Sequence, residues 1–193
     1  MIYLGDMAAR DHPKTAYVIL GMLALGKRTG YEIKALVDVS TRFFWAASYG
    51  QIYPELKRLE EAGLIRGEED PSDGRRRRAY QLTAAGRRAL RDWLTSDRPL
   101  VRELRHEGVL KLFFSDILEP KEQLEQIRRL RAEHEATRDR LREIEPGARE
   151  ADEARGLRFT LLTLDWGIAY QDAMIDWCSR AERELAAQAA VEA

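Results

Sequence analysis

The chain has 193 residues, enough for one domain with a good core or for two small domains. Charged residues make up 34% of it and hydrophobic residues 45%, which excludes a disordered chain and a membrane-spanning one. Its net charge is −1, but residues 1–100 carry 17 Lys and Arg against 13 Asp and Glu, whereas residues 101–193 carry 15 against 20. A basic half followed by an acidic half indicates one module that faces nucleic acid and another with a different task.

The first half predicts three helices after a polar leader at residues 1–14. The first helix covers residues 15–25, an apolar run too short to span a bilayer, and the second covers residues 30–40. The third begins at Ser48, because Gln51 three residues later completes the spacing of a capping box. Since Pro54 removes a backbone hydrogen bond, we expect a bend or a later start in this helix.

The third helix carries one buried stripe, formed by Ile52, Leu56 and Leu59, and it ends near Ala62. A β-hairpin of two short strands, residues 64–67 and 77–82, follows the glycine at position 63. Thr83 then predicts the N-cap of a fourth helix that ends at Leu94, with Leu90 and Leu94 pointing inward. Pro99 marks a boundary, so we expect a DNA-binding domain at residues 15–97 and a second domain at residues 98–193.

The second half predicts helices over residues 101–118, 120–145 and from about 149 or 156 to 190, with a break at the EPGA motif. The last helix carries a heptad seam of apolar residues with polar interruptions at Gln171 and Glu182. The residues predicted to pair two copies of this helix are Leu157, Leu161, Leu164, Ile168 and Ile175. A second row of apolar residues, which includes Trp166, Tyr170, Ala173 and Trp177, makes the apolar face too wide for a single partner.

Three helices followed by a hairpin predict a mainly α protein whose first domain is a winged helix-turn-helix. The major groove admits one α-helix, and the free face of the third helix carries side chains suited to bases and phosphates. These candidate DNA-binding residues are Tyr49, Gln51, Tyr53, Lys57 and Arg58. The hairpin adds four consecutive arginines, Arg75, Arg76, Arg77 and Arg78. Strand alternation sends Arg75 and Arg77 to one face and Arg76 and Arg78 to the other, so the four cannot share one role.

Three motifs stand in order within residues 15–95: TGYEIKALV, SYGQIYPELKRLEEAGLI and DGRRRRAYQLTAAGRRAL. With them the chain resembles the PadR family of bacterial transcriptional regulators. The second half, with HEGVLKLFF and a long closing helix, resembles the virulence-activator-like α domain of the longer PadR subfamily. The leader is longer than the usual start of the family. By motif position, the resemblance places DNA contacts on Tyr31, Ser48, Gln51, Tyr53, Lys57 and the hairpin arginines.

The resemblance implies a homodimer that binds double-stranded DNA at an inverted repeat and is released by a small phenolic or hydrophobic effector. Aromatic walls suit planar ligands, so the candidate effector-binding residues are Phe113, Phe114, Trp166, Tyr170 and Trp177. The interpretation that we favour for these five residues is instead that they fill the dimer core. Simpler roles are also open for the DNA-binding candidates: Ser48 and Gln51 only cap the helix, Tyr31 and Tyr53 only pack, and the arginines form a solvated loop.

An enzyme is not expected. The three histidines lack metal-ligand spacing, and the chain has no nucleophile, phosphate-loop or dinucleotide motif, so we predict neither a cofactor nor a metal. The single cysteine, Cys178, excludes an internal disulfide and is typical of the cytoplasm. We therefore expect a cytoplasmic, sequence-specific DNA-binding regulator, interpreted as a repressor, with no membrane partner. Two rival functions are a winged helix that contacts only proteins and a non-specific DNA binder.

Overall fold

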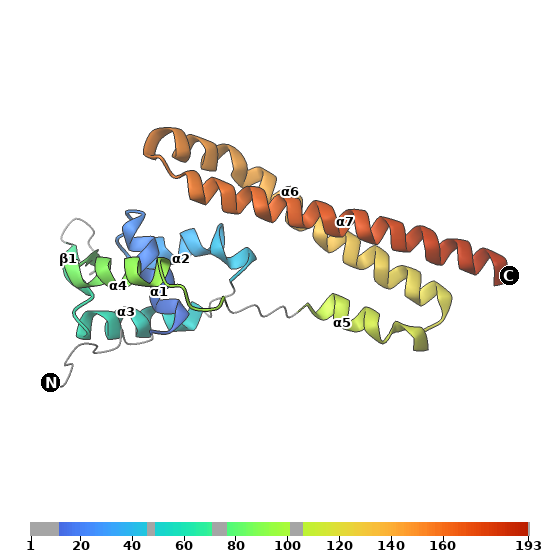
Figure 1. Cartoon of the computed structure of the whole chain (residues 1–193), viewed down its shortest axis with the longest axis horizontal. Coiled ribbons are helices and arrows are strands. Elements are labelled where there is room, and N and C mark those ends of the chain that lie inside the picture. Colours follow the sequence, from blue (N-terminus) through green and yellow to red (C-terminus); the bar gives the residue numbers. More distant parts are fainter. Residues whose placement is uncertain (1–11, 46–48, 71–76, 101–105, 193) are drawn as a thin grey trace. The chain divides into compact units, whose positions relative to one another are not determined.

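The computed structural model describes residues 12–45, 49–70, 77–100 and 106–192. The chain divides into two compact units, Met1–Leu100 and Val101–Ala193, which are described separately. Both units are built mainly from helices, and the first also contains a two-stranded hairpin (Figure 1). Among the described helices, none combines the length and the apolar character that a bilayer span requires.

The first unit confirms the predicted order of three helices, a hairpin and a fourth helix. Its helices are α1 (Lys14–Ala24), α2 (Gly30–Asp38), α3 (Ile52–Glu61) and α4 (Ala84–Leu94), with short 3-10 turns at Thr41–Phe43 and Tyr49–Gln51. The antiparallel strands β1 (Ile65–Asp70) and β2 (Arg77–Leu82) pair with Ile65 opposite Leu82. This arrangement is that of a winged helix-turn-helix.

The core of the first unit confirms the buried stripe predicted for α3. Ile52, Leu56 and Leu59 are almost completely buried and pack with apolar residues of α1 and α2. The inward position predicted for Leu94 is wrong, because this side chain is 67% exposed while Leu90 packs against the core. The residue before it, Trp93, contacts the first helix, because its ring stacks on Tyr17 with 4.7 Å between centroids.

Helix α3 starts later than a cap at Ser48 would place it, as Pro54 led us to expect. Its first residue is Ile52, so Pro54 is the third helical residue and its missing N–H falls where no carbonyl partner exists within the helix. Gln51 occupies the N-cap position and makes no side-chain capping hydrogen bond to the described residues. Ser48 lies outside the described residues. A capping box is present instead at α2, between Thr29 and Glu32.

The hairpin is joined to the helices at its base and along β2. Thr83 caps α4 as predicted, because its hydroxyl oxygen accepts from the Gly86 N–H at 3.1 Å. The same hydroxyl lies 2.8 Å from the carbonyl oxygen of Gly63. On the other side of the hairpin, the Tyr80 N–H donates to the Arg28 carbonyl at 2.6 Å, so the turn between α1 and α2 pairs with β2. The strands therefore hold a defined position on the helical core.

The second unit consists of a short helix and a pair of long ones. They are α5 (Glu107–Phe113), α6 (Pro120–Arg155) and α7 (Arg158–Glu192), with a 3-10 turn at Ser115–Ile117. The helix predicted over residues 101–118 is thus shorter within the described residues, because the His106 side chain accepts from the Val109 N–H and begins α5 there.

The predicted break at the EPGA motif is wrong, because α6 continues through Pro146 to Arg155. A proline inside a helix costs about 3 kcal/mol, an amount that packing along a long partner helix can offset. Arg149 and Glu145, on either side of Pro146, also pair across one helical turn. The helix ends at Gly156, whose φ of 66° is the left-handed conformation that terminates helices.

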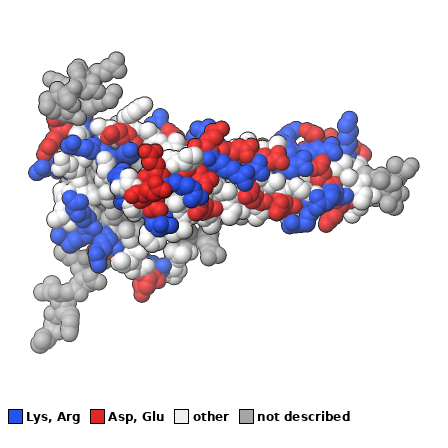
Figure 2. Space-filling view, turned by 90° about the horizontal axis from the view of Figure 1, so that it is seen from above, with Lys and Arg blue, Asp and Glu red and all other residues white. Residues whose placement is uncertain are grey.

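Helices α6 and α7 lie side by side and antiparallel along most of their length (Figure 1). Ile127 and Leu130 of α6 pack against Cys178 of α7, and burial raises the pKa of the Cys178 thiol. The polar interruptions of the seam also have partners in the same chain, since Glu182 accepts from Arg128 and Arg131 at 2.6 Å each. On the outer surface of these helices, acidic and basic side chains alternate (Figure 2).

Candidate nucleic-acid interface

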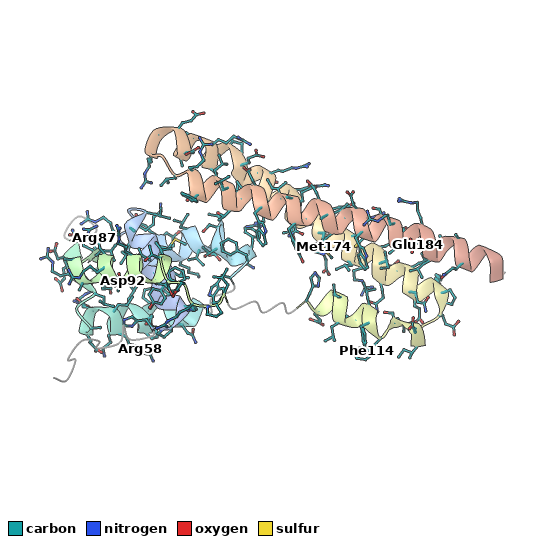
Figure 3. All side chains as sticks on the ribbon, in the orientation of Figure 1. Arg58, Arg87, Asp92, Phe114, Met174 and Glu184 are labelled. Atoms are coloured by element: carbon teal, nitrogen blue, oxygen red, sulfur yellow. The ribbon has the colours of Figure 1, made fainter. Side chains whose placement is uncertain are left out.

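The outer face of α3 is an exposed surface of polar and aromatic side chains. Gln51, Tyr53, Lys57 and Arg58 are all exposed, and Tyr53 is 60% exposed despite its size. Figure 3 shows Arg58 on the side of α3 that faces away from the core. Because the apolar stripe of α3 is fully used by the core, this opposite face is available to a ligand. The structure thus brings together four of the candidates on the third helix.

The two cations of this face are held by acidic neighbours on the same helix. Arg58 Nη1 lies 3.1 Å from Oε2 of Glu55, a carboxylate that is almost completely buried. Lys57 Nζ lies 3.8 Å from Oε1 of Glu61, and both of these side chains are exposed. An exposed pair of this kind contributes little to stability, so Lys57 can exchange its partner for a phosphate at small cost. Arg58 is more strongly oriented, because its partner cannot move into solvent.

Tyr53 is positioned by a close contact with the N-terminus of α2. A Cβ atom added at Gly30 would come within 2.7 Å of Tyr53 Cε1, so the ring lies directly over a residue without a side chain. The neighbouring Tyr31 is 65% exposed, which makes its interpretation as a core residue wrong. The face that carries Tyr53 therefore extends from α3 onto the start of α2.

The N-terminus of α2 is already occupied by an acidic side chain of the protein. The Glu32 carboxylate accepts from the backbone N–H groups of Arg28 and Thr29 at 2.9 Å each. The bond from Arg28 lowers the pKa of Glu32, although its partial burial opposes the shift. Because these donors are used, this helix end does not offer them to a phosphate.

Of the four hairpin arginines, only the last has a described side chain. Arg75 and Arg76 lie outside the described residues, and Arg77 is described in its backbone alone, as the first residue of β2. Tyr49 is likewise described in its backbone alone. Arg78 donates through Nη2 to Oε1 of Glu60 on α3, at 2.5 Å. The structure thus gives Arg78 a partner within the protein, on the helix that carries the exposed face.

Two residues near this face were missed by sequence reasoning. Glu60 lies 18 positions before its partner Arg78, and no periodicity links a helix residue to a strand residue at that distance. The carbonyl of Arg28 accepts from the Tyr80 N–H, which places this residue beside the hairpin. The Arg28 residue is exposed there. The available signals were an acidic residue at the edge of an apolar stripe, one turn after Leu56, and a basic residue in the turn before a helix.

The candidate effector residues form two separate aromatic pairs in the second unit. Phe113, the last residue of α5, and Phe114, its C-cap, meet edge to face with 5.1 Å between ring centroids, and both are exposed. Trp166 and Tyr170 of α7 stack at 5.9 Å, while Trp177 lies further along the same helix. Phe114 lies on the side of α5 away from α7 (Figure 3) and beside an open groove that Leu110, Ile117, Leu118 and Gln126 also line.

The predicted dimerisation residues lie on the seam that packs, within the same chain, against α6. Leu161 is buried, and Leu164, Ile168 and Ile175 of α7 are half-buried, as is Leu157, which directly precedes the helix. The seam is therefore used at least in part by α6. The apolar residues that α7 leaves exposed belong to another row, formed by Phe159, Leu162, Trp166 and Trp177.

The described side chains do not assemble a metal centre. Within residues 12–45, 49–70, 77–100 and 106–192, the structure contains no group of three or more His, Cys, Asp or Glu side chains suited to a metal ion.

Comparison with known proteins matches each unit to a family model. Residues 19–92 match the transcriptional regulator PadR-like family, and residues 104–186 match the virulence activator alpha C-terminal family. The negative transcriptional regulator PadR of Bacillus subtilis is 35% identical over 107 residues, which are 55% of this chain and 59% of that protein. The chain thus spans about three fifths of the length of this curated relative.

Solved structures extend the similarity over both units. The crystal structure of Bacillus subtilis PadR in complex with operator DNA has a TM-score of 0.76 and 25% identity, covering 90% of this chain and 99% of that one. The structure of the same protein in complex with p-coumaric acid shares the fold, with a TM-score of 0.70, 23% identity and the same coverage. The order of elements, the two family matches and these structures agree: the chain belongs to the PadR-like family of transcriptional regulators, in the form that carries a virulence-activator-like helical domain.

Proposed function

We propose that the chain is a homodimeric regulator that binds an inverted-repeat DNA operator, acts in the cytoplasm as a repressor, and releases DNA when a small effector binds. The proposal that the chain binds DNA is supported by the exposed face of α3, which presents an amide, a phenol and two cations beside the hairpin. The Bacillus relative with this fold was solved on operator DNA.

The roles of the α3 side chains follow from the chemistry of the major groove. Base edges there carry hydrogen-bond donors and acceptors that an amide can read, whereas phosphates attract cations without regard to sequence. Gln51 and Tyr53, at the start of α3, are the proposed base-reading residues, and Ser48 and Tyr49 precede them in the chain. Lys57, Arg58 and the arginines Arg75 to Arg77 are the proposed phosphate contacts, with Tyr31 at the edge of the face.

Dimerisation is proposed through the apolar row that α7 leaves exposed. Phe159, Leu162 and Trp166 repeat at spacings of three and four residues, so they share one side of the helix. A contiguous exposed apolar surface of this kind marks a protein contact, and two-fold pairing is the commonest form of homo-oligomer. The pairing would separate two recognition helices by one turn of DNA, about 34 Å, or a multiple of it.

The dimer is tested by the sedimentation of two α7 variants. Leu162→Glu places a charge in the exposed row and is expected to convert the dimer to a monomer. Thr163→Glu adds the same charge at the adjacent exposed position and is expected to leave the dimer intact. A Leu162→Glu protein that stays dimeric would refute this surface.

An effector site is proposed at the aromatic side chains of the second unit, with a planar phenolic or hydrophobic molecule as ligand. Fluorescence anisotropy with labelled operator tests this when p-coumaric acid is added as the probe. A loss of operator affinity that Trp166→Ala abolishes supports the site. If Trp166→Ala weakens the dimer and leaves the response unchanged, Trp166 belongs to the dimer core instead.

DNA binding itself is tested with duplexes from the region upstream of the coding sequence. Specific binding that falls steeply with salt, and exceeds binding to scrambled duplex, is expected because the protein displaces condensed counterions. Equal affinity for both duplexes would favour a non-specific binder. A lack of duplex binding would favour a winged helix that contacts only proteins.

A further inference from the structure

One carboxylate oxygen joins the recognition helix to both strands of the hairpin. Oε1 of Glu60 accepts from Nη2 of Arg78 at 2.5 Å and from the backbone N–H of Gly67 at 3.0 Å. Glu60 belongs to α3, Gly67 to β1 and Arg78 to β2. Three elements that approach one another only in the folded chain therefore meet at a single atom.

The side chains at the junction pack closely over the backbone of Gly67. A Cβ atom added at Gly67 would lie 2.8 Å from Glu60 Oε1, and closer still to Arg78 Nε. The ring of Tyr80, which pairs with Gly67 across the hairpin, would lie 3.0 Å from the same Cβ atom. A side chain at position 67 would displace the ends of the Glu60 and Arg78 side chains, so glycine there lets both lie close over the strand.

The charges at the junction are matched and partly shielded from solvent. The Glu60 side chain is 28% exposed and that of Arg78 is 51% exposed. The hydrogen bond from Arg78 lowers the pKa of Glu60, partial burial opposes it, and the Gly67 N–H adds to the lowering. The bond to Glu60 correspondingly raises the pKa of Arg78. Both groups thus stay ionised, and the pair persists at neutral pH.

We propose that Glu60 and Arg78 are positioning residues that fix the angle between α3 and the hairpin, so that operator recognition depends on them through geometry. This inference rests on the proposed DNA-binding function. It assigns Arg78 a role distinct from that of Arg75 to Arg77, which are proposed to contact phosphates. It also means that Glu60, although acidic, favours binding to DNA. A carboxylate that only faced the phosphates would have the opposite effect.

The test compares Glu60→Ala, Arg78→Ala and the double variant in operator-binding titrations over a range of salt concentrations. Each single variant is expected to lose about tenfold in operator affinity, and the double variant no more than Glu60→Ala alone, because Glu60→Ala already removes the bond from Arg78. The slope of log affinity against log salt is expected to stay at the wild-type value in all three, since no phosphate contact is removed.

A matched control removes the neighbouring carboxylate. Glu61→Ala deletes one negative charge from the same helix, where the carboxylate pairs with Lys57, and we expect unchanged or slightly tighter operator binding. Arg78→Lys keeps the charge while removing the planar fork, and it is expected to recover only part of the affinity. Thermal unfolding of every variant identifies a protein that has failed to fold, and the comparison is then made with Glu60→Gln, which keeps an acceptor for the Gly67 N–H.

Two results would overturn the proposal. One is tighter operator binding by folded Glu60→Ala, as expected for a carboxylate that only repels phosphates. The other is a salt slope reduced by about one in Arg78→Ala, as expected for a direct phosphate contact. A wild-type protein that does not distinguish operator from scrambled duplex would instead contradict the proposed function, so the two failures are distinguishable.

Discussion

Gln171 of α7 accepts a hydrogen bond from His134 of α6, with 2.5 Å between Oε1 and Nδ1, and both side chains are buried. His106 continues the chain of contacts, since its Nε2 lies 3.3 Å from Nε2 of His134. Its other ring nitrogen, Nδ1, accepts from the Val109 N–H at the start of α5. Gln171, a polar residue in the apolar seam of α7, thus has its hydrogen-bond partner within the same chain. Through His134 and His106 these contacts link α7, α6 and α5.

Replacing Gln171 by Leu is therefore expected to destabilise the second unit. The substitution leaves His134 Nδ1–H without an acceptor in a buried position, which costs about 1–3 kcal/mol in free energy of unfolding. Urea unfolding followed by circular dichroism measures this loss. The control, Gln188→Leu, alters an exposed residue of the same helix and is expected to change stability by less than about 0.5 kcal/mol. Equal effects of the two variants would contradict a specific role for the buried pair.

Adding a methyl group at Gly30 is expected to displace Tyr53 and weaken operator binding. The new Cβ atom would lie 2.7 Å from Tyr53 Cε1, so the ring must move off α2. Operator titrations are expected to show a loss for Gly30→Ala, and for the double variant a loss no larger than that of Tyr53→Ala, because Gly30→Ala acts through the position of the Tyr53 ring. As a control, Gly21→Ala in α1 has no atom within 4 Å of the new Cβ and is expected to stabilise the helix by about 0.5–1 kcal/mol. Additive losses in the double variant would argue against this contact.

Removing the Thr83 hydroxyl is expected to destabilise the winged helix. The side chain caps α4 and also bonds to the carbonyl of Gly63, so Thr83→Ala is expected to cost about 1–2 kcal/mol. Chemical denaturation measures the change. Thr83→Ser keeps the hydroxyl and should retain most of the stability, and an equally unstable serine variant would show that the hydroxyl is not the cause.

The stability of the second unit is expected to fall in acid because of Glu182. The hydrogen bond from Arg128 lowers the pKa of this carboxyl, burial opposes the shift, and the charge of Arg131 adds to the lowering. A carboxyl whose pKa is lower in the folded state contributes stability above its unfolded pKa, which is about 4.5. That contribution is lost as the pH falls through the folded value, so the loss begins below about pH 5.

The pH prediction is checked by the unfolding midpoint between pH 7 and pH 3. Glu182→Gln is expected to lower the midpoint at pH 7 and to flatten its decline in acid. Glu184→Gln, at an exposed position two residues later, is expected to keep the wild-type profile. A wild-type profile for Glu182→Gln would mean that other carboxyl groups cause the loss in acid.

The element types of the first unit were predictable because local rules determine them. The apolar spacing of Ile52, Leu56 and Leu59 decided which face of α3 is buried, and the position of Pro54 anticipated the late start of that helix. In the second unit the same rules failed at Pro146. A local pattern indicates a break there, but contact with α7 along most of α6 supplies free energy that a local rule does not include.

The sequence by itself determined the winged helix, the exposed residues of α3 and the family, because periodicity, caps and motif order are properties of neighbouring residues. Only the tertiary structure decided which polar groups meet across elements. It paired Arg78 with Glu60, His134 with Gln171 and Arg128 with Glu182. These partners lie 18 to 54 positions apart, and a directional hydrogen bond between them depends on how whole helices and strands pack.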